Sequence, residues 1–379
     1  MLRYKRKKKR SFTRKTLLLI NLIIAVSLLI SYSASFIDPS SFFWPIAFFG
    51  LAYLPLLIIN LGFITLWFFL DRKYILLSFL SILAGWSLLT KHFKISGPAN
   101  KQTEEIAEKE EKNLRVMSFN AHLFKPIDEE DTVNFANEAI LIIKNVKPDI
   151  ISFQEFYTQG KTENNTLQKI KKAGEFSAHY FDIASQNKAD AYGQVIFSKY
   201  PIIHAGTISE YNYGINRISY ADILRGKDTV RIYNVHLRSF ALQNADKKFF
   251  QRLIQSEIVE DKPKNLLRKL KTAFNGRSEQ AASLRSHIKE SKHYPIIVLG
   301  DFNDTPMSYA VNKISKNMHN AFQKKGRGWG VTHFDLMPIF QIDYILTSKN
   351  MDVVNYHIVK KKLSDHYPIW SDLYIKDEK

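Results

Sequence analysis

The sequence predicts an α/β domain, a layered sheet with covering helices, that follows a membrane-inserted N-terminal region. Long apolar runs behind a polybasic tail dominate the first 94 residues. From Arg115 onward, apolar runs of strand length alternate with helical patterns. Several of these runs end in a short cluster of acid, amide or imidazole side chains, and the ends of strands are where α/β proteins place their chemistry.

Composition limits the possible chemistry. The chain has 379 residues, no cysteine and a formal net charge of +18. This length allows one large domain with an appendage. The absence of cysteine excludes disulfides, thiolate nucleophiles and cysteine-bound zinc, so any metal must bind through oxygen or imidazole. The positive charge indicates an anionic partner, and lipid head groups, nucleic acid and a phosphorylated substrate all remain open.

Residues 1–94 are predicted to form a polybasic tail and about three transmembrane helices. A basic tail ahead of an apolar run is typical of a cytoplasmic topogenic signal, and the first run is too long for a cleaved signal peptide. The second run carries Pro45 and Pro55, so we expect a tilted or kinked span. The tail is Met1–Lys15, and the expected spans are Thr16–Ile37, Ser41–Leu70 and Tyr74–Thr90.

Cations between the expected spans predict the orientation in the membrane. Arg72 and Lys73 lie between the second and third spans, whereas residues 38–40 carry no cation. The positive-inside rule therefore places the N-terminus and the Arg72 loop in the cytoplasm. Three crossings then predict an integral protein of the inner or plasma membrane with its soluble domain on the extracytoplasmic side. A re-entrant second span would invert this result.

The remainder of the chain divides into a linker and one domain. Residues 95–113 are polar and rich in alternating charge, as expected of a linker or a short solvated helix. Residues 114–379 are predicted to fold as the domain. Its basic insertion, residues 239–275, fits a solvated helix face, and it also fits an amphipathic flap that meets the membrane surface or an anionic substrate.

Residues 295–306, PIIVLGDFNDTP, show the recurring pattern most clearly. The apolar run 296–299 is typical of a central strand, and we expect it to end at Gly300. Asp301, Asn303 and Asp304 then follow. A polar turn uses the same residue types, but an unrelated turn does not explain the repetition. The pattern recurs as VMSFN at 116–120, DIISFQE at 149–155, VRIYNVHLR at 230–238, IDYILTS at 342–348 and LSDHYPI at 363–369.

Together these motifs, in the order SFN, QE, NVHL, GDFN, IDYI and SDH, resemble the endonuclease/exonuclease/phosphatase superfamily, which has a DNase I-like fold. The resemblance extends from about Leu114 to Ile375. It implies a four-layered α/β sandwich, two packed sheets flanked by helices, with all six motifs at one rim. It also implies metal-dependent hydrolysis of phosphate esters.

The resemblance implies a divalent metal bound by oxygen ligands. Glu155 is similar to the principal carboxylate ligand of that metal, and Asn120 to the asparagine that helps to hold it. Asp365 resembles a neighbouring acid that can take a second metal. Oxygen ligands suit a hard cation, so Mg²⁺ or Mn²⁺ is expected.

The resemblance also implies catalytic roles. His366 is similar to a general base that Asp343 orients, because a carboxylate fixes the tautomer of an imidazole and favours its protonated form. Asp301 is expected to orient the attacking water, and Asn303 to contact a non-bridging phosphate oxygen. His236 resembles a histidine that contacts the scissile phosphate and protonates the leaving group.

Other residues fit the pattern less closely. Gln194 stands in GQVIFS, where the family usually has an asparagine. Arg217 and Tyr192 are secondary candidates for lining a phosphate cleft. Four histidines match no motif and are expected to be surface or internally satisfied residues; these are His122, His204, His287 and His333.

We therefore predict a membrane-anchored, divalent-metal-dependent hydrolase of phosphate esters, of phosphodiesterase or nuclease type. The expected partners are a phosphate-ester substrate, either nucleic acid or phospholipid, and the membrane, which the N-terminal helices contact; the sequence indicates no protein partner. One alternative is a lipid or head-group phosphoesterase of the sphingomyelinase or inositol-phosphatase kind. Another is a protein that binds phosphorylated ligands without hydrolysing them.

Overall fold

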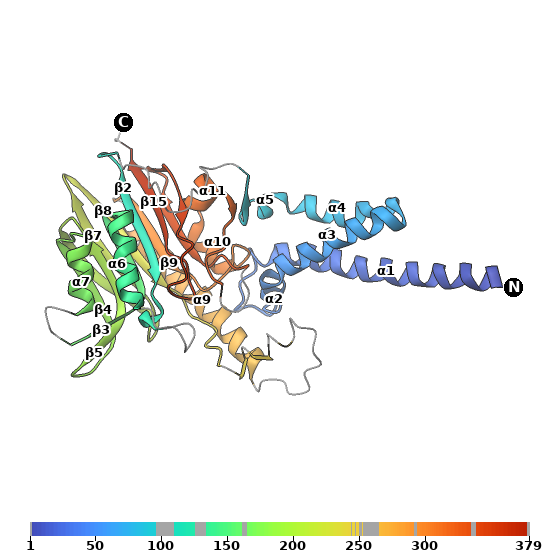
Figure 1. Ribbon diagram of the computed structural model, residues 1–379, viewed down its shortest axis with the longest axis horizontal. Coiled ribbons are helices and arrows are strands. Elements are labelled where there is room, and N and C mark those ends of the chain that lie inside the picture. Colours follow the sequence, from blue (N-terminus) through green and yellow to red (C-terminus); the bar gives the residue numbers. More distant parts are fainter. Residues whose placement is uncertain are drawn as a thin grey trace.

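The computed structural model describes most of the chain (Figure 1). Residues 96–109 of the expected linker and most of residues 244–264 in the basic insertion lie outside the described residues. Of residues 2–11 only the backbone is described. The described residues are 2–95, 110–125, 134–160, 165–243, 245, 246, 248, 249, 252, 265–291, 294–334 and 339–376.

The N-terminal region is a group of helices that projects from one side of the sheets (Figure 1). Asn21 joins three of them, because its Nδ2 donates to Ser78 Oγ at 2.7 Å and its Oδ1 accepts from Trp67 Nε1 at 2.8 Å. Buried amide bonds of this kind hold apolar helices in one register. The helices are α1 (Leu2–Ser33), α2 (Ile46–Leu51), α3 (Tyr53–Leu70), α4 (Ile75–Ala84) and α5 (Trp86–Leu89), with a 3₁₀ turn η1 (Arg72–Tyr74).

Two helices of the described chain are long and apolar enough to cross a membrane, Phe12–Ser33 and Tyr53–Leu70. The expected third span is not among them, because α4 ends at Ala84 and the helix is interrupted at Gly85. A Cβ atom at Gly85 would lie 2.2 Å from the ring of Tyr32, so the break lets α1 approach closely. The prediction of about three spans is therefore not supported.

The prolines of the expected second span begin helices instead of bending one. Pro45 is the N-cap of α2, and Pro55 lies in the first turn of α3. Proline is tolerated there because the first N–H groups of a helix have no partner within the helix. The predicted single long span is thus two separate helices, divided at Ala52.

The remaining chain contains two large sheets. The six-stranded sheet has the order β10-β12-β9-β8-β7-β6, and the seven-stranded sheet has the order β13-β15-β2-β3-β5-β4, with β14 paired to β15. The first contains β6 (Ile202–Tyr213), β7 (Asn216–Arg225), β8 (Asp228–His236), β9 (Ile296–Asp301), β10 (Met318–Asn320) and β12 (Asp343–Ser348). The second contains β2 (Leu114–Asn120), β3 (Ile150–Gln159), β4 (Ala178–Gln186), β5 (Asp190–Ser198), β13 (Met351–Val353), β14 (His357–Ile358) and β15 (Ile369–Ile375).

The sheets and helices form four layers. One apolar cluster lies between the sheets and includes Val116 and Ile196 of one sheet and Ile232 and Ile297 of the other. Further clusters bury the outer face of each sheet beneath helices. The covering helices are α6 (Phe135–Val146) and α7 (Thr166–Ala173) on one side, and α9 (Leu266–Glu290) and α10 (Tyr309–Ser315) on the other; the short α11 (Ala321–Lys325) lies beside β12.

Strand register brings the ends of several strands to one rim. β2 and β3 are parallel and pair Asn120 with Gln154. β8 and β9 are parallel and pair His236 with Asp301. The antiparallel β12 pairs Asp343 with Asp301. Residues that are far apart in sequence thus meet because the sheet hydrogen bonds place them opposite one another.

The N-terminal helices pack directly on the segment that follows Asp301. Ser35 Oγ donates to the Met307 carbonyl oxygen at 3.1 Å, and Asn312 Nδ2 donates to Ser35 Oγ at 3.2 Å. Met307 belongs to the apolar cluster of the helices. A two-stranded pairing of β1 (Phe93–Lys94) with β11 (Gly328–Trp329) adds a second connection.

Candidate active site

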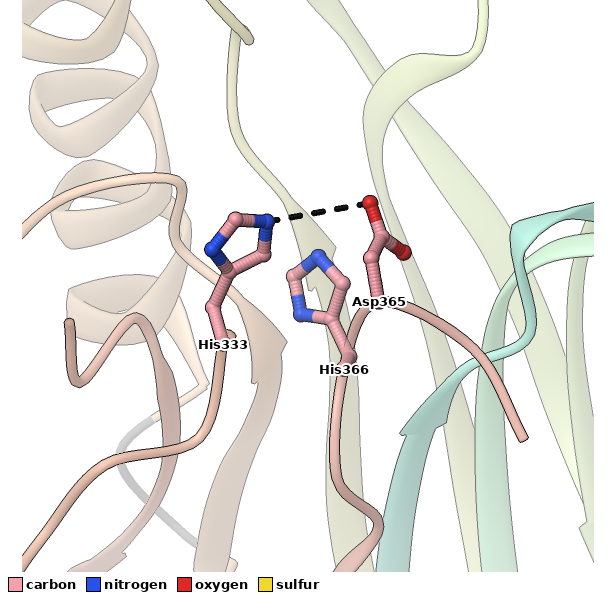
Figure 2. Close-up of side chains that lie close together, drawn as sticks. All are labelled: His333, Asp365 and His366. Carbon is pink, nitrogen blue, oxygen red and sulfur yellow. Dashed lines mark ion pairs between the residues drawn. The ribbon is translucent and has the colours of Figure 1, made fainter. Parts of the chain in front are cut away.

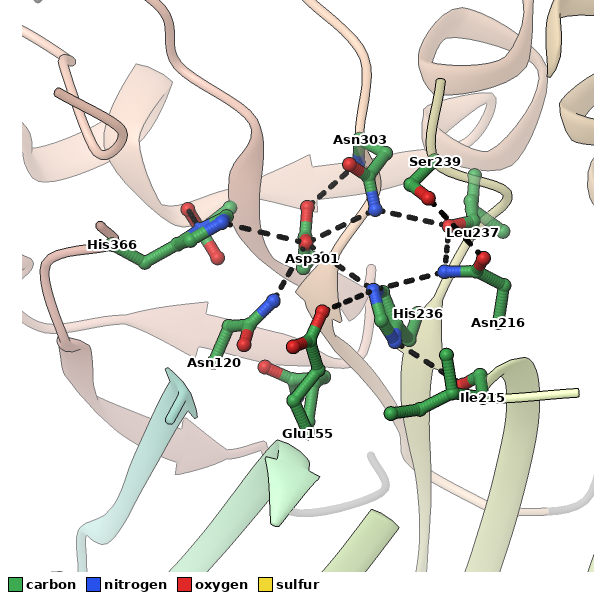
Figure 3. Close-up of polar contacts among 12 residues, drawn as sticks. Asn120, Glu155, Ile215, Asn216, His236, Leu237, Ser239, Asp301, Asn303 and His366 are labelled. Atoms are coloured by element: carbon green, nitrogen blue, oxygen red, sulfur yellow. Dashed lines mark hydrogen bonds and ion pairs between the residues drawn. The ribbon is translucent and has the colours of Figure 1, made fainter. Parts of the chain in front are cut away.

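Asp301 is the centre of the polar network at the rim (Figure 3). Its carboxylate accepts hydrogen bonds from Asn120 Nδ2 at 3.0 Å, from the Asn303 backbone N–H at 2.7 Å and from Asn303 Nδ2 at 3.1 Å. His236 Nε2 and His366 Nε2 lie 3.6 and 3.7 Å from Asp301 Oδ2. The side chain is 1% exposed, so this network replaces the water that an exposed carboxylate would bind.

Gly300 allows this placement. The strand β9 continues through Gly300 to Asp301, so the predicted strand end at Gly300 is wrong. Gly300 has a φ of +144°, and a Cβ atom there would lie 2.0 Å from the Val235 carbonyl oxygen. Only glycine lets β8 and β9 pair this closely at the point where both deliver site residues.

His366 and Asp343 form a buried pair. His366 Nδ1 donates to Asp343 Oδ2 at 2.9 Å, which directs Nε2 toward Asp301. Burial opposes protonation of this imidazole, but the carboxylates of Asp343, Asp301 and Asp365 outweigh it and raise the pKa of His366 well above its usual value. The predicted dyad is therefore present as geometry, with the carboxylate selecting the tautomer.

His236 lies on the other side of Asp301 and is fully enclosed. Its Nδ1 donates to the Ile215 carbonyl oxygen at 3.2 Å, and its Nε2 accepts from Asn216 Nδ2 at 3.0 Å. Burial lowers the pKa of His236 despite the nearby Asp301 carboxylate. Hydrogen bonds at both ring nitrogens therefore fix the orientation of this neutral imidazole.

Glu155 projects from an irregularity within β3. The strand does not end at Glu155, as the sequence suggested, but runs on to Gln159. The pairing of β3 with β5 shifts register between Phe153 and Phe156, and Glu155 has a φ of +48°. A bulge of this kind turns one side chain out of the strand's alternation. Glu155 therefore points toward the rim, with Oε1 3.6 Å from His236 Nε2.

Asp365 lies near two histidines that matched no motif, His122 and His333, of which Figure 2 shows His333. His122 Nδ1 is 3.4 Å from Asp365 Oδ1, and His333 Nε2 is 3.7 Å from Asp365 Oδ2. Burial opposes ionisation of Asp365, but the facing imidazoles of His366, His122 and His333 hold the pKa of its carboxyl well below its usual value. The prediction that His122 and His333 are surface or internally satisfied residues is wrong, because Nδ1 of each is buried and makes no hydrogen bond to any described residue.

The other two unassigned histidines agree with expectation. His287 Nδ1 is hydrogen-bonded to Tyr233 Oη at 2.8 Å, and the His204 side chain is 62% exposed. Arg217 does not fit the expected phosphate contact, because its guanidinium donates to Asp182 Oδ1 at 2.9 Å and to the Gly214 carbonyl oxygen at 2.6 Å.

Buried amides connect the two sheets beneath the site. Gln154 Nε2 donates to Asn234 Oδ1 at 2.7 Å, and Asn234 Nδ2 donates to the Phe153 carbonyl oxygen at 2.9 Å. Gln194 Nε2 similarly donates to the Arg217 carbonyl oxygen at 2.9 Å. The amides of the QE, NVHL and GQVIFS motifs therefore fix the relative position of the sheets.

A buried ion pair supports the loop after Asp301. Arg277 Nε donates to Asp304 Oδ2 at 2.8 Å, and Arg277 Nη1 donates to the Arg238 carbonyl oxygen at 2.9 Å. The Arg277 side chain is fully buried. Sequence reasoning missed Arg277, because it lies among many exposed cations in and after the basic insertion, and their spacing does not distinguish it.

The arrangement offers oxygen and nitrogen atoms to a cation. Two groups of side chains each place their ligand atoms within 4.8 Å of one another, Asp301 with Asp343 and His366, and His333 with Asp365 and His366. Among the described residues, neither Glu155 nor Asp365 forms an ion pair with lysine or arginine. Their charge is therefore available to a metal ion.

Comparison with known proteins identifies the catalytic region. Residues 117–366 match the endonuclease/exonuclease/phosphatase family, and residues 14–92 match a separate domain of unknown function (DUF8431). No curated protein matches the sequence. The chain belongs to the endonuclease/exonuclease/phosphatase family, and it is a phosphoester hydrolase.

The chain is also similar to solved structures. An endonuclease/exonuclease/phosphatase from Beutenbergia cavernae is 16% identical with a TM-score of 0.50, and the alignment covers 70% of this chain and 72% of that one. A family member from Bacteroides vulgatus is 18% identical with a TM-score of 0.49, covering 70% and 99% of the two chains. The first of these likenesses supports the DNase I-like fold of the catalytic region.

Proposed function

We propose that this protein is a membrane-anchored hydrolase of phosphate esters that depends on a divalent metal, with phosphodiester substrates such as nucleic acid as the leading class. The observation that carries the proposal is the convergence of the His366–Asp343 pair, Asp301 and Glu155 at one rim. A protein that only binds phosphate needs no imidazole oriented by a buried carboxylate. The alternative of a non-catalytic binding protein is therefore disfavoured.

Glu155, Asn120 and Asp365 would hold the metal, with Mg²⁺ or Mn²⁺ expected. Glu155 and Asp365 are 25% and 19% exposed, so both are accessible from the rim. When bound, such an ion polarises a phosphoryl oxygen and neutralises developing negative charge. The Asn120 side chain is already held in place, because its Oδ1 accepts a hydrogen bond of 3.1 Å from the backbone N–H of His122.

His366 would act as the general base. Its Nδ1 is committed to Asp343, so Nε2 is the atom that accepts a proton from water. Asp301, 3.7 Å from Nε2, lies where it can orient that water. After proton transfer, the imidazolium is stabilised by the same carboxylates that raise the pKa of His366.

His236 and Asn303 would contact the phosphate. Asn303 Nδ2 donates to the Leu237 carbonyl oxygen at 3.0 Å as well as to Asp301, so both amide hydrogens are already used within the protein. A phosphate oxygen would have to replace one of these acceptors. His236 Nε2 faces both Glu155 and Asp301, and protonation of a leaving group there would require a proton on that nitrogen.

The N-terminal helices would anchor the enzyme. Helix α1 approaches the charged end of α3, where Arg14 Nη2 donates to the Leu70 carbonyl oxygen at 3.4 Å and Arg14 lies 3.9 Å from Asp71. The positive-inside rule places Arg14 and the basic tail on the cytoplasmic side. The opposite ends of the helices contact the catalytic domain, which would then lie on the extracytoplasmic side of the inner or plasma membrane.

One observation favours a lipid or head-group phosphoesterase as the second candidate. The helices pack on residues 305–312, directly after the site residues Asp301 and Asn303. A membrane that holds these helices would therefore lie near the site, and a lipid phosphate ester would reach it without leaving the bilayer surface.

Hydrolysis assays on DNA, RNA, phospholipids and nucleotides, each with and without added Mg²⁺ or Mn²⁺, test the proposal. We expect metal-dependent release of product from at least one class, abolished in His366→Ala. If wild type and His366→Ala bind a phosphorylated ligand equally and neither hydrolyses any substrate, the protein is a binding protein. Resistance of the protein to alkaline carbonate extraction from membranes tests anchoring separately.

A further inference from the structure

The helices that cover the seven-stranded sheet leave a groove lined by lysine. The groove lies between α6 and α7, has a volume of about 740 Å³ and includes Ile140 and Ile143 in its lining. Its cations come from three separate parts of the chain: α6 with its C-cap, α7, and the residue after β5. They are Lys144, Lys147, Lys169, Lys172 and Lys199, and Glu175 is the one acid among the described lining residues.

These positive charges are not neutralised within the described part of the chain. None of the five lysines forms an ion pair with a described residue, whereas Lys361, beside the same helix, pairs with Glu138 of α6. Four of the five are exposed, and Lys199 is half-buried. Lys169 and Lys172 are neighbours on the surface of α7, where like charges destabilise a helix. A concave surface with this excess of cations therefore favours binding of an anion.

The ends of the helices do not account for the whole cluster. Cations near a helix C-terminus interact favourably with its free carbonyl groups, which explains Lys144 of α6 and Lys172 of α7. Lys199 instead follows the last residue of β5, and its backbone N–H donates to the Asp149 carbonyl oxygen at 2.8 Å. This bond places a further cation beside the end of α6, from an element without a helix dipole.

The groove runs away from the rim of the active site. α6 and α7 each follow a strand that runs toward the rim, so both helices begin near the rim and end at the opposite edge of the sheet. A smaller groove of about 250 Å³ shares Ile140 and Lys169 and includes Asn134 and Asn165, the N-caps of the two helices. Polar lining thus extends from the rim end of the helices to the lysines at the far end.

A very short substrate bound at the rim does not reach the far lysines. Ile150 pairs with Ser198, next to Lys199, and Glu155 lies five residues further along β3 at the rim. A strand rises about 3.3 Å per residue, which places the far end of the groove about 16 Å from the rim. One strand of a duplex carries a phosphate about every 3.4 Å along its axis, so about five nucleotides span that distance.

The position of the groove distinguishes between lipid and nucleic acid. Figure 1 shows α6 and α7 on the opposite side of the sheets from α1 and α3. Lipid of a membrane that holds α1 and α3 therefore does not reach these lysines, whereas a polymer in solution does. No aromatic side chain is among the described lining residues, so the groove suits contacts to phosphates and not stacking of bases.

We propose that this groove is a second nucleic-acid-binding site, which holds the phosphodiester backbone of a strand whose scissile phosphate lies at the rim. The inference rests on the proposed phosphodiesterase function and names nucleic acid as its substrate class. Contacts to phosphates carry no sequence information. The enzyme therefore binds long strands more tightly than short ones, whatever their sequence.

Binding of fluorescein-labelled single-stranded DNA to the full-length protein in nanodiscs of zwitterionic lipid tests the proposal. Fluorescence anisotropy in EDTA, which prevents metal-dependent cleavage, gives the affinity at several salt concentrations. Lys144→Gln/Lys172→Gln should weaken binding of a long strand and reduce the slope of log K against log[salt] by about 1.4, because each phosphate contact on a single strand contributes about 0.7. The control Lys289→Gln/Lys324→Gln removes two exposed lysines of α9 and α11 and should bind as wild type does.

Cleavage kinetics separate this site from the catalytic residues. The groove variant should raise KM for the long strand, leave kcat unchanged and cleave a dinucleotide as wild type does. Unchanged affinity, salt slope and KM for the long strand in the groove variant would overturn this inference alone. If the wild type hydrolyses no phosphate ester, the proposed function fails, and anisotropy still decides whether the groove binds DNA. Loss of binding to phosphatidylglycerol vesicles with DNA binding retained would assign the groove to lipid and also overturn the inference.

Discussion

The carboxylates on the two sides of the site, Asp301 and Asp365, differ in exposure and in the length of their contacts. Asp301 is 1% exposed and accepts hydrogen bonds of 2.7–3.1 Å from Asn120 and Asn303. Asp365 is 19% exposed, and its contacts with His122 and His333 are 3.4 and 3.7 Å long. We call these the Asp301 side, with Asn120 and Asn303, and the Asp365 side, with His122 and His333. Hydrogen bonds from the protein already hold the Asp301 carboxylate, whereas the Asp365 carboxylate has lone pairs left for a cation. We propose that the Asp301 side positions the attacking water and that the Asp365 side binds the metal.

Glu155→Gln should have the largest effect, because Glu155 is the proposed principal metal ligand and its carboxylate is partly exposed at the rim. The change removes a ligand charge and little volume. Loss of a metal ion worth several kcal/mol in the transition state lowers the rate by about 10³-fold or more. Activity across a Mn²⁺ and Mg²⁺ titration measures this, with Glu138→Gln as the surface control. Near wild-type activity at saturating metal would refute the ligand assignment.

Arg277→Met should destabilise the Asp301 side. The change leaves the buried Asp304 carboxylate without its cation, which costs about 3–5 kcal/mol of unfolding free energy. The double variant Arg277→Met/Asp304→Asn removes both charges and should recover part of the loss. Denaturant unfolding of the three proteins decides between this account and simple loss of packing, which predicts no recovery.

His366 lies between the two sides and should report on both through its pKa. In metal-free protein the imidazole should keep its proton above its usual pKa of about 6.5, because carboxylates from both sides raise it. Asp343→Asn removes one of these charges and should lower the pKa of His366. The ring-nitrogen shifts of ¹⁵N-histidine followed against pH measure this; a pKa that does not fall in Asp343→Asn would contradict the electrostatic account.

Ser35→Ala should have the smallest effect, since it acts on the Asp301 side from a distance. It removes hydrogen bonds to the Met307 carbonyl oxygen and from Asn312. A loss of about 1 kcal/mol in stability is expected. Thermal unfolding in detergent measures it, and Thr65→Ala, which removes a bond within α3, is the matched control.

The sequence could predict the Asp301 side because strand register created it. A strand that ends in Asp, Asn or His places that side chain at the rim. The pairs His236–Asp301 and Asp343–Asp301 then arise because their strands are neighbours in the sheet. The Asp365 side depends on a turn of left-handed residues at His122 and on an isolated bridge at His333. Neither leaves a periodic pattern in the sequence, so motif reasoning predicted both histidines to be surface or internally satisfied residues.

The same distinction applies to the helices. Hydropathy identified apolar segments correctly, because composition alone decides whether a segment is apolar. It could not locate the break at Gly85, which depends on the close approach of Tyr32 from another helix. The bulge at Glu155 is a similar case, since the register shift is a property of the β3–β5 pair and not of either strand.

Specific activity across a double-mutant cycle of His366 and Asp343 tests the central claim most directly. The variants are His366→Ala, Asp343→Ala and the double variant, each compared per folded molecule at saturating metal. General acid–base catalysis is worth roughly 10²–10⁴ in rate. If the pair acts as one unit, all three variants should lose a similar factor within that range. Independent, multiplicative losses, or full specific activity in the folded fraction, would show that the pair is structural and would contradict the account.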